Sequence, residues 1–167
     1  MASWSEFADA APALAASIRA VFHQYGPGLG YLATIRADGG PRLHPVAPTV
    51  VMGGLYCCVV DTPKRHDLDR DPRFALHSFP AEDSDDEAGV RGTARLVTDP
   101  GVIRRVAMAT RADSRVEWWL YELRVDSAFY VRRSSAKSIQ TWTDPGRWQQ
   151  QPPSAPATVA YLHLRAG

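Results

Sequence analysis

The sequence predicts a mainly β, α+β fold in which about six antiparallel strands close into a small barrel flanked by helices. Glycine-rich turns at residues 38–40 and 53–54 separate apolar runs of strand length. Helical patterns occur only at the N-terminus and after two proline-marked caps, which places them at the ends and crossovers of the sheet. A sheet of this size protects its edges by closing on itself, and this favours a barrel.

The first third of the chain carries the patterns of one helix and three strands. Ser3 and Glu6 have the spacing of a capping box, and the apolar residues after them recur at helical spacing, which predicts a helix over residues 4–24. Glycines then break the helix. We expect strands at 31–36, 42–52 and 55–60, joined by short turns as a meander.

Proline-marked caps organise the rest of the chain. Thr62 and Pro63 have the form of an N-cap and a first helical residue, and they open a short polar helix that ends before Pro72. Asp99 and Pro100 open another helix, which runs to about residue 111. The other expected elements are strands at 73–79, 89–98 (with a bulge at Gly92), 116–125 and 129–132, and a solvated acidic loop at 82–87.

Length and composition indicate one domain. The 167 residues suffice for one core, so we expect a barrel domain over 1–148 with its N-terminal helix, followed by a Pro/Gln-rich arm over 149–167. The net charge is +1, so no overall field draws the chain to nucleic acid or to an anionic membrane. No apolar run has the length of a membrane span and no basic segment precedes an apolar one, so we expect a cytoplasmic protein.

The two cysteines are adjacent in an expected strand. Cys57 and Cys58 point to opposite faces and lack the spacing of a zinc site, so the sequence favours two small apolar fillers and no metal site.

The strongest local signal for a ligand lies at the start of the short polar helix. There the free amides and the positive dipole end of a helix stand beside Lys64 and Arg65, which is an arrangement that binds anions. A phosphate monoester would accept from the hydroxyl of Thr62 and from both amides, and the two side chains would neutralise it. The alternative is an ordinary solvated helix start with basic residues.

Two further places carry candidate ligand contacts. His44 lies among apolar residues of the strand expected at 42–52, where it is either a packing residue or, through the neighbouring hairpin strand, part of a flat ligand surface near Thr62. Trp142 and Arg147 frame a turn near the end of the barrel domain. They belong either to core closure or to a lid over a flat ligand.

Taken in order, several short motifs resemble the pyridoxamine 5'-phosphate oxidase-like family of split β-barrels. They are an Asp-Gly-Gly-Pro-Arg turn, a Thr-x-Lys helix start, an Asp-Pro-Arg-Phe-Ala-Leu strand entry and a Gly-x-Ala strand. The segments that carry them are YLATIRADGGPRLHPVAPTVV (31–51), LYCCVVDTPKRHDLDRDPRFALHSF (55–79) and VRGTARLV (90–97). The resemblance covers roughly residues 28–148.

The resemblance implies a six-stranded split β-barrel that forms a homodimer and binds FMN between its subunits; some family members bind the deazaflavin coenzyme or haem instead. Carried over by position, it puts residues along the cofactor ring, at its phosphate and, near the end of the barrel, over the site. The residues along the ring itself are His44, Pro45 and Val46, and those along the ring and its chain are Asp61 and Thr62. The phosphate residues are Lys64 and Arg65, and the residues reaching in from the end are Trp142 and Arg147.

The resemblance implies the cofactor class rather than one reaction, because the oxidases themselves usually have arginine where His44 stands. The first expectation is an FMN-dependent oxidoreductase that moves a hydride to or from a small molecule, with no residue identified as a catalytic acid or base. The alternatives are a deazaflavin-dependent reductase, with Arg42, His66 and Arg147 along the longer cofactor, and a flavin- or haem-binding protein without turnover.

Overall fold

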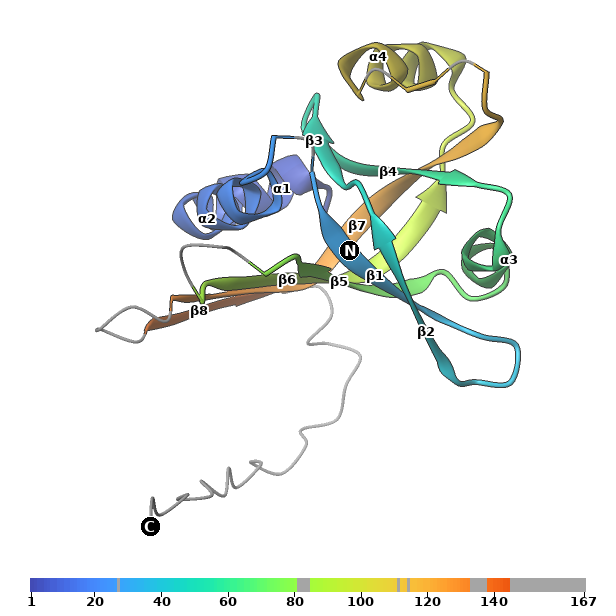
Figure 1. Cartoon of the computed structure of the whole chain (residues 1–167). Coiled ribbons are helices and arrows are strands. Elements are labelled where there is room, and N and C mark those ends of the chain that lie inside the picture. Colours follow the sequence, from blue (N-terminus) through green and yellow to red (C-terminus); the bar gives the residue numbers. More distant parts are fainter. Residues whose placement is uncertain (27, 81–84, 111, 114, 133–137, 145–167) are drawn as a thin grey trace.

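The structure is a computed structural model that describes residues 1–26, 28–80, 85–110, 112–113, 115–132 and 138–144 (Figure 1). Within these residues, eight strands form one antiparallel sheet with four helices around it. In chain order the elements are α1 (Trp4–Ala10), α2 (Pro12–Phe22), β1 (Gly30–Ile35), β2 (Pro41–Val46), β3 (Thr49–Val51), β4 (Gly54–Val60), α3 (Pro63–Arg70), β5 (Arg73–Ser78), β6 (Glu87–Leu96), α4 (Pro100–Thr110), β7 (Trp118–Arg132) and β8 (Ser138–Thr143).

The sheet curls because its two edges are neighbours in the chain. The strand order is β2-β1-β5-β6-β7-β4-β3, with β8 paired to β7, so β2 and β3 are the edges. Only Ala47 and Pro48 separate these two strands, and so short a link forces the edges together. A Cβ atom on Gly28 would lie 1.7 Å from the carbonyl oxygen of Pro48, so this closure needs glycine there. The predicted split-barrel class is confirmed.

The structure corrects the expected order of the first strands. The strand predicted at 42–52 is two strands, β2 and β3, which end and begin around Pro48. β2 pairs with β1 and β3 pairs with β4, so the expected meander is wrong: the two hairpins lie at opposite edges of the sheet. Proline donates no backbone hydrogen bond, and here it marks the change of partner.

Three other boundaries differ from expectation. The helix predicted over 4–24 is broken at Ala11, which has φ −143°, and it restarts with Pro12 as the first residue of α2. The strands predicted at 116–125 and 129–132 are one strand, β7, whose second half pairs with the unexpected strand β8. The bulge predicted at Gly92 is confirmed by a shift in the β6–β7 register there, which leaves one extra residue on β7.

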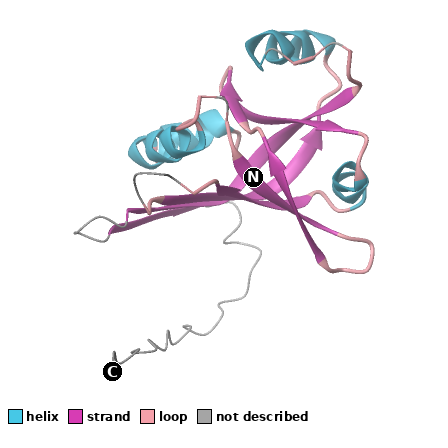
Figure 2. Cartoon of the chain, in the orientation of Figure 1, coloured by secondary structure: helices cyan, strands magenta, loops and turns pink. Residues whose placement is uncertain are grey.

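The helices lie around the curled sheet (Figure 2). α1 and α2 close the barrel core, where Phe7, Ile18, Leu32 and Leu55 are fully buried. α4 covers a smaller cluster on the outside of β4 and β7. No helix of the described residues is long and apolar enough to cross a membrane. The predicted arm over 149–167 lies outside the described residues.

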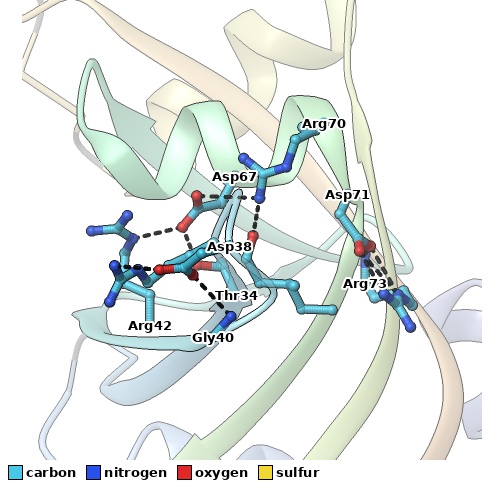
Figure 3. Close-up of polar contacts among 10 residues, drawn as sticks. Thr34, Asp38, Gly40, Arg42, Asp67, Arg70, Asp71 and Arg73 are labelled. Carbon is cyan, nitrogen blue, oxygen red and sulfur yellow. Dashed lines mark hydrogen bonds and ion pairs between the residues drawn. The ribbon is translucent and has the colours of Figure 1, made fainter.

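A buried carboxylate fastens α3 to the β1–β2 hairpin (Figure 3). Asp67 of α3 accepts a hydrogen bond from the hydroxyl of Thr34 on β1 at 2.9 Å and one from Nε of Arg42 on β2 at 2.7 Å. Arg70 pairs with its other oxygen at 3.5 Å and also donates to the carbonyl oxygen of Ile35. Separating the Asp67 carboxylate from these partners would leave a buried charge without compensation, which is strongly destabilising. The contacts of Asp67 therefore fix the orientation of α3 on the barrel.

The same contacts decide the ionisation of Asp67. Burial raises the pKa of the carboxyl group, but the hydrogen bonds from Arg42 and Thr34 outweigh burial, and the net pKa lies below its ordinary value. A carboxylate with a lowered pKa in the folded state stabilises the fold above its unfolded pKa of about 4, and this contribution is lost as the pH falls through the folded-state pKa.

We expect Asp67→Asn to lower the free energy of unfolding by about 2 kcal/mol at pH 7, because it weakens two hydrogen bonds to a charged group. Urea denaturation measures this loss, and the gap between wild type and variant should narrow as the pH is lowered below about 4. Asp38→Asn is the control, since Asp38 pairs with Arg36 on the surface. If wild type and Asp67→Asn differ in free energy of unfolding by the same amount at acid and at neutral pH, the charge of Asp67 does not stabilise the fold.

Candidate functional site

The strand β2 directs His44 toward the inside of the barrel. Its register partner on β1 is Leu32, which is fully buried, and residues opposite each other in a sheet share a face. Val46, two residues on, is also buried, whereas Pro45 between them is exposed on the outer face. Of the three residues predicted along a cofactor ring, His44 and Val46 therefore face inward and Pro45 faces outward.

His44 lies within reach of the charge at the start of α3. Burial lowers the pKa of its imidazole first, and the positive charges of Lys64 and Arg42 lower it further against the opposing charge of Asp67. His44 is therefore neutral at neutral pH. Its Nε2 atom is buried and has no hydrogen-bond partner within the described residues. The expected route to Thr62, through a paired neighbouring strand, is wrong, because α3 rather than β4 brings the charge to β2.

Thr62 is the N-cap residue of α3, as predicted, but its side chain makes no capping hydrogen bond to the helix. Thr62 is extended, with φ −146° and ψ 163°, and its hydroxyl donates to the carbonyl oxygen of Val60 at 3.1 Å instead of accepting from the helix. The amide of Arg65 donates to the carbonyl oxygen of Thr62 at 2.9 Å. Pro63 has no amide hydrogen, and the amide of Lys64 has no hydrogen-bond partner within the described residues.

Arg65 is held by neighbouring side chains. Its guanidinium donates to Asp61 at 3.0 Å, lies 3.7 Å from a carboxylate oxygen of Asp69, and stacks over the ring of Trp119 at 3.8 Å from the ring centroid. Asp69 also accepts a hydrogen bond from the hydroxyl of Tyr121 at 2.5 Å. The positive charge of Arg65 is thus largely balanced inside the protein, and Asp61 is one of the groups that balance it.

Lys64, unlike Arg65, has no partner for its charge within the described residues. The residue is half-buried, its ammonium group makes no ion pair or hydrogen bond with these residues, and its charge lowers the pKa values of His44 and Cys57. Burial raises the pKa of the Cys57 thiol to about 12, with a smaller contribution from Cys58, so the thiol stays protonated. This fits the predicted role of an apolar filler. The start of α3 therefore holds one unbalanced cation, one free amide and one unpartnered imidazole nitrogen.

The remaining predicted site residues lie elsewhere. Trp142 on β8 packs against Phe7 of α1, with ring centroids 4.9 Å apart, so its indole takes part in core closure. β8 and α3 lie at opposite ends of the molecule (Figure 1). Arg147 lies outside the described residues. Within this chain, His44, Asp61, Thr62, Lys64 and Arg65 come together and Trp142 does not.

An aromatic surface on the outer face of the sheet escaped the sequence analysis. Tyr31 on β1 stacks on Phe79 at 5.1 Å between centroids, Tyr25 meets Phe79 edge-on at 6.3 Å, and His77 lies 5.9 Å from Phe129. No described helix covers this face. The sequence signal for this surface was Tyr31, an aromatic residue in an expected strand. In the structure, residues 31, 33 and 35 of β1 are half-buried and alternate with buried neighbours, so they share the second face of the strand.

The comparisons with known proteins concern the fold. No protein-family model matches the chain, and no curated protein matches its sequence. General stress protein 26 from Bacillus anthracis superposes with a TM-score of 0.57 at 17% identity, over 77% of this chain and 96% of its own. A related protein from Clostridium acetobutylicum, described as of the pyridoxinephosphate oxidase family, superposes with a TM-score of 0.56 at 10% identity, over 83% and 95%.

A haem-binding protein from Mycobacterium smegmatis also superposes, with a TM-score of 0.56 at 20% identity. The match covers 75% of this chain but only 57% of that protein, so the chain spans little more than half its length. These matches agree with the curled sheet. The chain therefore has the pyridoxamine 5'-phosphate oxidase-like split β-barrel fold.

Proposed function

We propose that this protein binds FMN with its phosphate at the start of α3 and acts as a flavin-dependent oxidoreductase. The observation that carries the proposal is the unbalanced ammonium of Lys64 beside its own free amide at a helix N-terminus. A phosphate takes both donors and is favoured by the helix dipole. Fold similarity to a protein of the pyridoxinephosphate oxidase family supports the same cofactor class.

Each residue of this site has a distinct part in the proposal. Lys64 neutralises the phosphate, and the contacts of Arg65 to Asp61 and Asp69 hold the first turn in place. The Nε2 atom of His44 offers a hydrogen bond to the ring, and a neutral imidazole can either donate or accept it. FMN, when bound, supplies the hydride chemistry. The protein contributes binding, orientation and a hydrogen bond at the ring.

The deazaflavin coenzyme fits this surface less well. Its longer acidic tail needs more cations along the groove, and Arg42, one of the expected ones, is committed to Asp67 at 2.7 Å. The His66 ring lies 3.4 Å from a carboxylate oxygen of Asp61, so it too is directed at a carboxylate of the protein. The charges available at the start of α3 suit one phosphate.

A homodimer is part of the proposal. The aromatic face of β1 and β5, which no described helix covers, lies beside β2, where Leu43 has 63% of its surface exposed. Apolar and aromatic surface without a covering helix is typical of an interface. The strand β8, which carries Trp142, lies far from α3, so within one chain this residue does not reach the start of α3 (Figure 1). A two-fold partner would cover the face and supply the missing wall of the site.

Haem binding without turnover is the second candidate, and the similarity to a haem-binding protein favours it. A neutral imidazole such as that of His44 is an iron ligand in many haem proteins, but its Nε2 atom is buried in this chain and would have to become accessible. The visible absorption spectrum of the purified protein separates the two candidates, because flavins and haem absorb in different bands.

We expect Lys64→Ala to weaken FMN binding by about ten- to a hundredfold, since a charge-assisted contact contributes about 1.5–3 kcal/mol. Fluorescence titration with FMN and with riboflavin, which lacks the phosphate, measures the effect. The wild type should prefer FMN strongly, and Lys64→Ala should lose most of that preference.

Arg19→Ala is the matched control, because it removes one positive charge from an exposed position on α2. It should bind both flavins as the wild type does. Equal affinities of the wild type for FMN and riboflavin would rule out a phosphate site at α3.

We expect Leu43→Glu to convert the dimer into a monomer and to weaken FMN binding at least tenfold, because it places a charge in the proposed interface. Size-exclusion chromatography with light scattering measures the mass. Met108→Glu is the control, since Met108 is a 74% exposed apolar residue on α4. A monomeric Leu43→Glu protein with unchanged FMN affinity would show that the partner contributes nothing to the site.

A further inference from the structure

We infer that a second binding site lies between α4 and the outer face of β3 and β4, and that it takes a small, neutral, mostly apolar molecule of single-ring size. A pocket of about 200 Å³ occupies this place. It lies on the opposite face of the sheet from the barrel core, so the inference stands apart from the proposed cofactor site. The lining residues are Ala47, Thr49, Tyr56, Cys58, Val106, Thr110 and Ala112.

α4 rests on the sheet through Val102, Ile103 and Val106, and the pocket lies beside this contact, at Thr110 where the helix ends. Val106 is the one residue of α4 that is fully buried, and it packs on Tyr56 and Leu120. The ring of Tyr56 leans back over Gly54, where a Cβ atom would lie 2.4 Å from the ring. This tilt leaves the space above Cys58 unfilled, and glycine at position 54 is what permits it.

The lining defines the chemistry of the ligand. Among the described residues no charged side chain lines the pocket, and a charged ligand would lose its hydration without compensation from them. Burial raises the pKa of the Cys58 thiol, and a contact with the Thr110 hydroxyl opposes this, so the thiol is protonated. The Cys58 thiol and the Thr49 hydroxyl can donate to a polar atom of a guest. The Thr110 hydroxyl donates to the carbonyl oxygen of Val106 at 2.9 Å, so toward a guest it can accept.

The size of the pocket fits one ring. An apolar cavity of about 150 Å³ in another protein is known to bind benzene. Phenol, which adds one hydroxyl group to that ring, therefore matches both the volume and the polar atoms and is the probe of choice.

Ligand-observed NMR titration of phenol tests the inference. Ala112→Phe places a ring in the pocket and should weaken phenol binding at least tenfold. Ala109→Phe is the matched control, because Ala109 is exposed on α4 and does not line the pocket. It should bind phenol as the wild type does. Equal binding by both variants overturns the inference.

Alkylation of Cys58 provides a second measurement that needs no variant. Phenol should slow the reaction of iodoacetamide with Cys58 in the native wild-type protein, because ring and reagent compete for one space. The modified cysteine is identified by peptide mass spectrometry. An alkylation rate at Cys58 that is unchanged at saturating phenol overturns the inference. Neither measurement requires a bound flavin, so failure of the proposed cofactor site leaves this test intact.

Discussion

The buried carboxylate of Asp67 is the constraint on which the candidate site depends. It joins a short, polar helix with little apolar surface of its own to two strands that lie far from it in the sequence. Leu68 adds a buried apolar contact, and Asp69 adds a hydrogen bond to Tyr121 on β7. Because a buried charge keeps its partners, α3 has one position on the barrel. That position places the start of α3 beside His44.

The same network divides the cations of this region into two groups. Arg42 and Arg65 are paired with carboxylates and hold the structure together, whereas Lys64 has no such partner within the described residues. A site that must attract a phosphate and release it needs a cation that is not already neutralised, and this arrangement supplies one. Arginine serves here in fixed, multidentate contacts, and lysine is left as the free charge, which follows the different geometry of the two side chains.

Features governed by local sequence were predictable. The turns at Gly39 and Gly53, which both have positive φ, and the helix starts at Pro63 and Pro100 depend on neighbouring residues only. Features governed by distant contacts were not. Whether Pro48 lies in a β-bulge or between two strands depends on where the edges of the sheet meet. The partners of Arg65 depend on the packing of α3 against β7. The core role of Trp142 likewise needed the position of Phe7.

A structure of the protein with bound FMN would show whether a phosphate occupies the start of α3. We expect the phosphate within hydrogen-bond distance of both the ammonium and the amide of Lys64, with the ring lying along His44 and covered by a second copy of the chain. FMN bound elsewhere on the barrel, or bound with its phosphate in solvent away from α3, would contradict the account.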